Sequence, residues 1–275
     1  MRILCTGGTG FLGQALCKRL LERRHEIVVI ARDEGDLIAF KSKFPRVKII
    51  IGDIINKWVI QEAMVGVEGV FHMAAQKHVG LSEEFVYQTV NSNVLGTINL
   101  LEESWKVKPK FMLGVSTDKA SNPKGVYGAT KLLMERLFQQ SERINPDTDY
   151  RIVRYGNVMG STGSFVTKWK PLMEQGKEVI LTDPKATRFY WDVEEAIDLI
   201  FECLEKSSDC SPCIPKMKAI SMQQALEACQ EVYGDCPVKV IGLQQGENLH
   251  ETIDGVIHSN EVEQYTKQEF KQKFL

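Results

Sequence analysis

The sequence predicts an α/β protein: a Rossmann-type, doubly wound parallel sheet with a smaller C-terminal lobe. Up to Val158, short apolar runs alternate with stretches of helical period, which is the pattern of repeated βαβ units. The runs are rich in β-branched residues and almost continuously hydrophobic, as at 49–51, which is typical of strands that helices cover on both faces. A glycine-rich segment follows the first run directly, where such folds bind dinucleotides.

The expected strands and lobes follow from these runs. The strands cover Arg2–Thr6, Glu26–Arg32, Val47–Asp53, Gly69–Ala75, Lys110–Thr117 and Tyr150–Val158. Beyond Val158 the pattern loosens, and prolines punctuate shorter elements. We therefore predict a dinucleotide-binding domain over residues 1–158 and a mainly substrate-binding lobe over residues 159–275, of which the part near 190–215 returns to the first domain. A substrate is expected between the two.

Composition and charge argue against several classes of protein. The chain has 275 residues, 43% of them hydrophobic and 25% charged, and its formal net charge is -2 without a long basic run. This balance offers no attraction to a nucleic-acid backbone or an anionic membrane, so neither is an expected partner. The apolar runs are far shorter than the roughly 20 residues of a membrane-spanning helix. Because the chain opens on a strand and not on a signal peptide, we expect a cytoplasmic location.

The seven cysteines are scattered from Cys5 to Cys236 and do not resemble the dense framework of a small secreted domain. Cys210 and Cys213 form a single CxxC, but no second close pair of cysteines or histidines completes a zinc site. We expect free thiols, an ordinary loop around the CxxC, and no bound metal.

The glycine-rich segment opens a helix directly after the first strand. Gly7 permits a tight turn, Gly10 a close approach of the backbone to a pyrophosphate, and Gly13 close helix packing. The free N–H groups at a helix N-terminus also attract phosphate. We therefore predict a dinucleotide site made by Gly7, Thr9, Gly10, Phe11, Leu12 and Gly13.

The end of the second strand bears on the choice of cofactor. Ala31 occupies the place of an acidic residue that would bind a ribose 2′-hydroxyl, and Arg32, which follows, suits a 2′-phosphate. This favours NADP, although Asp33 is close enough in sequence to reach a ribose, so NAD stays open. At later strand ends, further cofactor contacts are expected from Asp53, Ile54, Ala74 and Ala75.

Tyr127 and Lys131 open a strongly helical stretch and lie one turn apart on the same face. A nearby ammonium and a positive nicotinamide favour the phenolate, which makes the tyrosine a usable acid or base near neutral pH. Both residues are also expected at the cofactor. The pair follows a strand that ends at residues 116–119 (Ser-Thr-Asp-Lys). This order of glycine-rich loop, Ser/Thr strand end and YxxxK resembles the extended short-chain dehydrogenase/reductase family.

More specific matches run through most of the chain. They are residues 116–123 (STDKASNP), 154–160 (RYGNVMG), 182–184 (TDP), 187–189 (TRF) and 246–251 (GENLHE). Together they resemble the polysaccharide-biosynthesis 4,6-dehydratases, a group that includes soluble UDP-N-acetylglucosamine 4,6-dehydratases. The resemblance implies a catalytic set of Thr117, Asp118, Lys119, Tyr127 and Lys131. Thr162 and Gln76 stand where the group usually has an arginine and an apolar residue.

These residues suit a dehydration, because three acid/base groups stand beside a redox cofactor. Tyr127 would take the proton of the sugar O4 as C4 is oxidised, with Thr117 hydrogen-bonded to that oxygen. The ketone acidifies the C5 hydrogen, so Lys119 can remove it if its surroundings lower its pKa, while a protonated Asp118 helps the C6 hydroxyl to depart. Reduction at C6 then regenerates the cofactor, and no cosubstrate is consumed.

Substrate contacts are expected near the diphosphate and the sugar. Asn157 and Arg188 are assigned to the diphosphate by resemblance, and arginine matches phosphate geometry. Lys77 and Glu247 are expected in the same site. The implied substrate is a UDP-sugar. Asn93 resembles the structural asparagine that orders hydrogen bonds near the active site in this group.

Three functional interpretations stay open. The 4,6-dehydratase leads, and a tyrosine at position 127, where some membrane-anchored relatives carry methionine, favours inversion at C5. A 4-epimerase or reductase on the same scaffold would keep Tyr127 and Lys131 but make no use of Asp118 and Lys119. A non-enzymatic NADP-sensing regulator would bind the cofactor and give no product. In each case the helices that flank the sheet are expected to pair subunits in a homo-oligomer.

Overall fold

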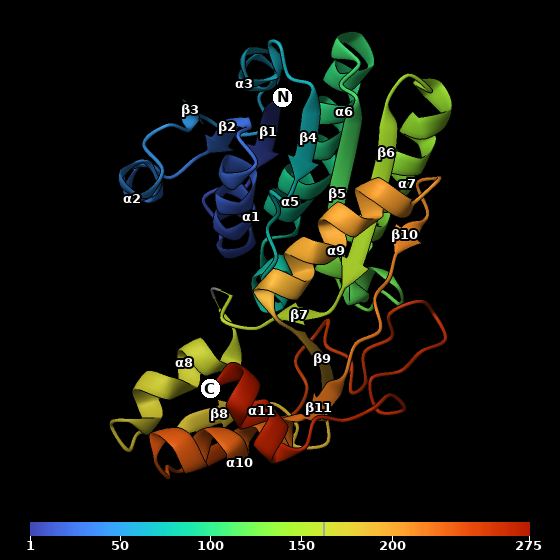
Figure 1. The fold of residues 1–275 in the computed structure, drawn as a ribbon. Coiled ribbons are helices and arrows are strands. Elements are labelled where there is room, and N and C mark those ends of the chain that lie inside the picture. The colour runs from blue at the N-terminus through green and yellow to red at the C-terminus, as the bar shows by residue number, and fades with distance from the viewer. Residues whose placement is uncertain (162) are drawn as a thin grey trace.

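A computed structural model of the protein describes residues 1–161 and 163–275. Seven parallel strands form its central sheet, in the order β10-β6-β5-β4-β1-β2-β3 (Figure 1). Their bounds are β1 Arg2–Thr6, β2 Glu26–Ala31, β3 Lys48–Ile51, β4 Gly69–His72, β5 Phe111–Thr117, β6 Asp149–Tyr155 and β10 Pro212–Cys213. The predicted Rossmann-type α/β fold with a doubly wound parallel sheet is therefore confirmed.

One predicted strand is too long. The expected range Tyr150–Val158 divides at Gly156, because β6 ends before it and β7 (Asn157–Val158) pairs with β9 (Thr187–Trp191) in a different sheet. A Cβ atom at Gly156 would lie 2.5 Å from the Cβ of Phe189. Only a glycine lets the chain pass this close to β9 as it leaves the central sheet.

The segment around the CxxC is also not the predicted loop. Cys213 lies in β10, the edge strand that pairs with β6, and Cys210 is buried just before it. A strand of two residues that begins with proline carries no alternation of apolar and polar residues, so the sequence could not reveal it. The seven cysteines, all within the described residues, are free thiols.

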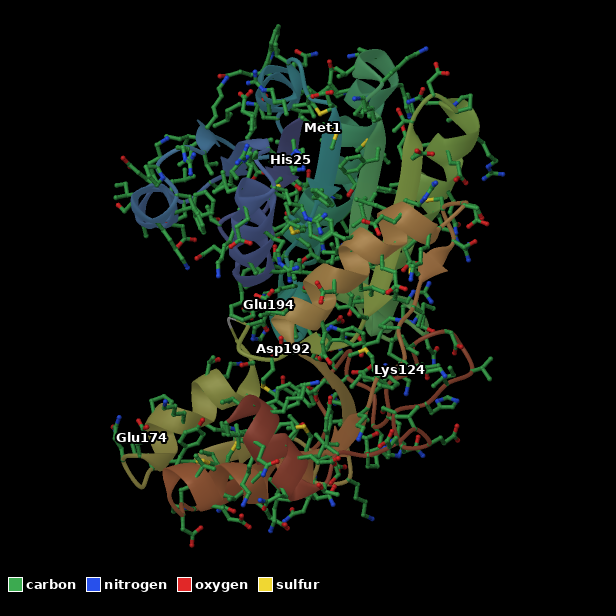
Figure 2. The ribbon with its side chains drawn as sticks, in the orientation of Figure 1. Met1, His25, Lys124, Glu174, Asp192 and Glu194 are labelled. Atoms are coloured by element: carbon green, nitrogen blue, oxygen red, sulfur yellow. The ribbon has the colours of Figure 1, made fainter. Side chains whose placement is uncertain are left out.

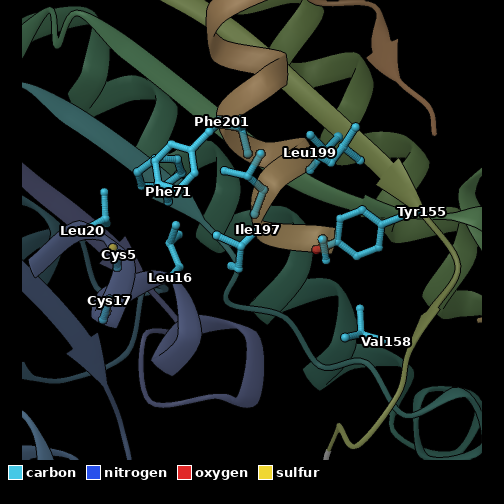
Figure 3. Close-up of a cluster of buried hydrophobic side chains, with 14 of the residues drawn as sticks. Cys5, Leu16, Cys17, Leu20, Phe71, Tyr155, Val158, Ile197, Leu199 and Phe201 are labelled. Carbon is cyan, nitrogen blue, oxygen red and sulfur yellow. The ribbon is translucent and has the colours of Figure 1, made fainter. Parts of the chain in front are cut away.

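Helices cover both faces of the central sheet. One face carries α1 (Phe11–Glu22), α2 (Glu34–Lys43) and α9 (Val193–Lys206), and the other carries α3 (Lys57–Met64), α6 (Gly96–Val107) and α7 (Val126–Ile144). Successive strand residues point to opposite faces, so Val29 belongs to the core under α1 and α9, and Val28 to the core under α3 and α6. Figure 3 shows part of the first core, with Leu16 and Ile197 facing each other across it.

The smaller lobe follows β7 and has its own core. Its elements are α8 (Phe165–Met173), β8 (Val179–Leu181), β9, β11 (Ala219–Ser221), α10 (Met222–Tyr233), β12 (Val238–Val240) and α11 (Lys267–Phe274). Trp169, Tyr190 and Phe270 are buried together between its helices and strands. The C-terminus lies in this lobe, at the opposite end of the molecule from the N-terminus (Figure 1).

The chain returns from the smaller lobe to the central sheet through α9. Asp192 caps this helix, with its side chain and that of Glu195 forming a reciprocal capping box. In the first turn of this helix, Glu194 accepts a hydrogen bond from Arg19 of α1 at 2.6 Å. Figure 2 shows Asp192 and Glu194 at the end of α9 nearest the smaller lobe.

No helix among the described residues is long and apolar enough to cross a membrane, and these residues contain no group of three or more His, Cys, Asp or Glu side chains arranged for a metal. The cytoplasmic location and the homo-oligomer stay predictions from the sequence.

A buried ion pair, with its hydrogen bonds, links four segments of the chain. Arg154 of β6 donates to both carboxylate oxygens of Glu135 on α7, at 2.9 and 2.5 Å. Glu135 also accepts a hydrogen bond from Ser116 of β5, and the second arm of Arg154 donates to the carbonyl oxygen of Ile253 at 3.0 Å. Because Glu135 is 2% and Arg154 9% exposed, each charge depends on the other for its solvation.

Replacing Glu135 with glutamine therefore leaves a buried guanidinium without its counter-charge. We expect Glu135→Gln to lower the free energy of unfolding by about 3 to 5 kcal/mol, measured by urea denaturation. The matched control is Arg136→Gln on the same helix, where the exposed side chain bonds only Gln139 and the loss should stay below about 0.5 kcal/mol. Equal losses in the two variants would contradict this account.

Candidate active site

A cleft of about 890 Å³ lies between the carboxyl ends of the central strands and the smaller lobe. Its walls include the segments that follow β1, β2, β4, β5 and β6, together with α8 and β9. Among the described residues, each one predicted for the site from sequence lines this cleft except Asp118. Thr162 lies outside the described residues.

The phosphate loop forms one end of the cleft. Gly7 has a φ of +71°, and a Cβ atom on Gly13 would lie 2.4 Å from the Gly7 carbonyl oxygen, so the turn and the helix can pack this closely only with glycine at both positions. Gly10 precedes α1, and the first turn of this helix holds no acidic residue. Its N–H groups therefore suit an anionic group in the cleft.

Arg32 and Asp33, which follow β2, also line the cleft. The guanidinium of Arg32 donates to Asp53 at 3.1 Å and keeps 63% of its side chain exposed. Asp33 accepts a hydrogen bond from the Asp36 amide at 2.8 Å and thereby caps α2. Both side chains are exposed and line the cleft, with Arg32 bonded to a neighbouring carboxylate and Asp33 to a backbone amide.

Asn93 holds the segment after β4, which carries Ala74 and Ala75, against α7. It lies in a single π-helical turn, Asn91–Leu95, a kind of irregularity that often marks a functional site. Its side chain bonds both the amide (2.7 Å) and the carbonyl (2.9 Å) of Gln76, and also the Thr130 hydroxyl of α7 (3.0 Å).

Helix α7, which carries Tyr127 and Lys131, packs directly on the turn that follows β5. A Cβ atom on Gly128 would lie 2.3 Å from the carbonyl oxygen of Lys119, so glycine is required for this approach. The contact brings Tyr127 against Thr117, whose hydroxyl also donates to Asp118 at 2.9 Å. Lys131, one turn along α7, is 3% exposed and donates to the sulfur of Met134 at 2.9 Å.

Burial sets the protonation of Tyr127 and Lys131. It raises the pKa of Tyr127 to about 12, although the Lys119 ammonium and the Thr117 hydroxyl oppose it. It lowers the pKa of Lys131 to about 8, against the attraction of the Glu135 carboxylate. In the protein alone, burial therefore favours the protonated form of Tyr127, and the phenolate expected beside a positive nicotinamide stays a prediction.

Lys119 sits between two buried carboxylates. Its ammonium lies 3.0 Å from Asp118 and 3.4 Å from Glu251. Burial by itself lowers the pKa of Lys119, but the two carboxylates outweigh it and raise the pKa overall. The condition that its surroundings lower this pKa is thus not met. The Asp118 side chain is fully buried, and burial raises its pKa. Its Oδ2 atom has no hydrogen-bond partner among the described residues.

Glu251 is the site residue that sequence reasoning missed. Besides Lys119, it lies 3.6 Å from the Nε of Arg188 and accepts a hydrogen bond from Asn248 at 3.3 Å. Its pKa is lowered, because the two cations outweigh the effect of its burial. The quoted segment 246–251 contained this residue, but only the fold brings it beside the turn after β5.

The four predicted substrate residues line the cleft, and hydrogen bonds anchor Arg188, Asn157 and Glu247 in the protein. Arg188 donates to the carbonyls of Thr187 (2.9 Å) and Leu249 (3.1 Å), and Asn157 donates to the carbonyl of Phe189 (3.1 Å). Glu247 accepts from the Gln244 amide (3.0 Å). Burial lowers the pKa of Lys77.

The sequence and fold have known relatives. UDP-N-acetylglucosamine 4,6-dehydratase (inverting) of Campylobacter jejuni subsp. jejuni serotype O:2 is 36% identical over 261 residues, which cover 91% of this chain and 76% of that protein. UDP-glucose 4-epimerase of Rickettsia canadensis is 33% identical over 261 residues with the same coverage.

Solved structures agree in fold. The structure of Pen from Bacillus thuringiensis has a TM-score of 0.88 at 30% identity and covers 91% of this chain and 79% of its own. The NAD complex of UDP-glucose 4-epimerase from Thermus thermophilus has a TM-score of 0.81 over 92% of this chain and 90% of its own, and at 22% identity it shows likeness of fold alone. A family model described as "Polysaccharide biosynthesis protein" matches residues 3–273. The chain therefore belongs to the polysaccharide biosynthesis protein family, within the short-chain dehydrogenase/reductase type of fold.

Proposed function

We propose that the protein is a nucleotide-sugar 4,6-dehydratase, a lyase that converts UDP-N-acetylglucosamine to a 4-keto-6-deoxy sugar with inversion at C5. The cluster of Asp118, Lys119 and Glu251 beside Tyr127 carries this proposal. Moving a proton at C5 and releasing the C6 hydroxyl require acid/base groups beyond the tyrosine of an epimerase or reductase. Identity to the Campylobacter dehydratase supports the same choice, and the Rickettsia proteins make a 4-epimerase the alternative.

A nicotinamide dinucleotide, which we propose to be NADP, fits the phosphate-loop end of the cleft. The N–H groups at the start of α1 suit its diphosphate, and the exposed Arg32 suits a 2′-phosphate. One oxygen of Asp33 is used to cap α2. When bound, the nicotinamide supplies the oxidation at C4 that makes the C5 hydrogen acidic, and the later reduction at C6.

Tyr127 is the group that we propose to move the proton at O4. Its hydroxyl must first lose its own proton to solvent in the open cleft, and the Lys119 ammonium and the Thr117 hydroxyl both favour that ionisation. Tyr127 then accepts the O4 proton, while Thr117 orients the oxygen by a hydrogen bond. Arg188, Asn157, Lys77 and Glu247 hold the rest of the UDP-sugar in this proposal.

Lys119 and Asp118 act as one proton-carrying pair. A shift of the proton along their 3.0 Å hydrogen bond gives a neutral amine at Nζ and a carboxylic acid at Asp118. A substrate that fills the cleft and excludes water favours this neutral form. Nζ can then take the C5 proton, and the pair returns a proton to the departing C6 oxygen through Lys119, since Asp118 has no surface in the cleft. After reduction at C6, a proton from solvent on the opposite face of C5 completes the product with inversion.

The first test is mass spectrometry of UDP-N-acetylglucosamine incubated with the purified protein and either NADP or NAD. We expect loss of one water, and a higher rate with NADP. An isomer of unchanged mass would replace the proposal with the epimerase, and a higher rate with NAD would overturn the cofactor assignment. No change with this or other nucleotide sugars would contradict an enzymatic role and favour a cofactor-binding regulator.

The second test separates the elimination from the oxidation. Lys119→Ala removes the base at C5 and should lower the rate of water loss by about 100-fold or more, measured by the same mass change. Lys124→Ala is the matched control, because Lys124 lies in the same loop with an exposed side chain (Figure 2) and should retain full turnover. Full turnover of Lys119→Ala would exclude the dehydratase mechanism.

Lys131 gives a test by pH, because a buried ammonium paired with a sulfur costs stability. Its pKa falls from 10.5 to about 8 on folding, so below pH 8 the folded state carries a burial penalty of about 3 kcal/mol. We expect Lys131→Met to be more stable than wild type at pH 7, by up to that amount. The gain should shrink as pH rises through 8 and vanish near 10.5, in urea denaturation without cofactor. A variant less stable than wild type at pH 7 would contradict this.

A further inference from the structure

The start of α7 lacks a cap of its own. Gly125 precedes the helix, its first turn holds no acidic residue, and Tyr127 is the second residue of that turn. A free backbone N–H at this point needs an acceptor, because the helix leaves its first four amide groups unpaired. The acceptor comes from another element, α4 (Val79–Glu84), where the Glu83 carboxylate receives the Val126 amide at 2.6 Å.

The same carboxylate reaches a third segment. Its other oxygen accepts a hydrogen bond from the Gln245 side chain at 3.2 Å. Gln245 belongs to a tight turn in which Gln244 and Glu247 bond each other twice, at 3.0 and 3.1 Å, and both of these residues line the cleft. Glu83 therefore joins the first turn of α7 to a wall of the cleft.

Two glycines make room for this junction. A Cβ atom on Gly125 would lie 2.4 Å from Oε1 of Glu83 and 2.7 Å from the Cα of Gly246. Gly246 has a φ of +81°, and its own Cβ would lie 3.0 Å from the same oxygen. The two backbones meet directly over the carboxylate, so a shift of either segment must displace the other.

We propose that Glu83 is a positioning residue that fixes Tyr127 relative to the turn Gln244–Glu247. It does not line the cleft, and it acts through the α7 backbone and the Gln245 side chain. Its negative charge also suits the positive end of the α7 dipole. The consequence for turnover rests on the proposed function, in which a displaced Tyr127 hydroxyl no longer meets the sugar O4.

Hydrogen exchange tests the junction without any substrate. The reporters are the amide of Val126 and the amide of Glu247, which bonds the Gln244 carbonyl. We expect Glu83→Ala to speed exchange at both by about tenfold. Glu83→Gln keeps one acceptor oxygen for the Val126 amide and presents an NH2 group to Gln245, whose own amide can turn over to accept from it, so exchange should stay near wild type. The control Glu84→Ala, which removes an exposed carboxylate of the same helix, should also stay near wild type. Unchanged exchange at either reporter in Glu83→Ala would overturn the proposal.

If Glu83→Ala does not fold, Gln245→Ala provides a second test of the junction. It removes only the bond from the turn, so exchange should rise at Glu247 and stay unchanged at Val126. Equal exchange at Glu247 in this variant and wild type would also overturn the proposal.

Steady-state kinetics with the UDP-sugar distinguish a positioning role from a merely structural one, because a merely structural role would not lower kcat at unchanged KM. Glu83→Ala should lower kcat by about tenfold with little change in KM, and Glu83→Gln should restore most of it. A Glu83→Ala variant with full kcat would contradict the role in positioning. A wild-type protein that turns over no nucleotide sugar would contradict the proposed function instead, and the exchange measurements would still decide whether Glu83 joins the segments.

Discussion

The ion pair between Glu135 and Arg154 is the constraint on which the site depends. It places one carboxylate where β5, β6 and α7 converge, and Arg154 extends the link to the Ile253 carbonyl of the C-terminal segment. Two charges this deeply buried tolerate little displacement, because separating them leaves each without solvation. The elements that carry Thr117, Lys119 and Tyr127 are thus held at fixed spacing by two residues that do not line the cleft.

Within that frame, charges of opposite sign alternate from the buried Asp118 to residues that line the cleft. Asp118, Lys119, Glu251 and Arg188 follow one another as anion, cation, anion and cation, each within 4 Å of the next. This order explains why Lys119 can be buried and still charged, and why its use as a base requires a proton shift inside the cluster and not a simple loss of its proton to water. Close approach at Gly128 brings the cluster to Tyr127.

Much of the fold and the position of the site followed from local sequence. Buried parallel strands are apolar throughout, so the six longer ones were predictable to within a few residues, and motifs at their ends gave a set of residues that line one cleft. The features that could not be predicted from the sequence depend on tertiary contacts. The two residues of β10 have no pattern of their own, the pKa of Lys119 depends on Glu251 far along the chain, and Glu83 looks like any exposed acid of a short helix.

The path of the chain between the two lobes limits how the protein can be divided. The chain leaves the central sheet at Gly156, returns with α9, and leaves again after β10. A fragment ending at Val158 would lose α9, uncover the apolar surface beneath Ile197 and Ile200, and turn β6 into an open edge strand. The dinucleotide-binding half is thus not a transferable module: in evolution, as in protein engineering, the two lobes have to be exchanged together.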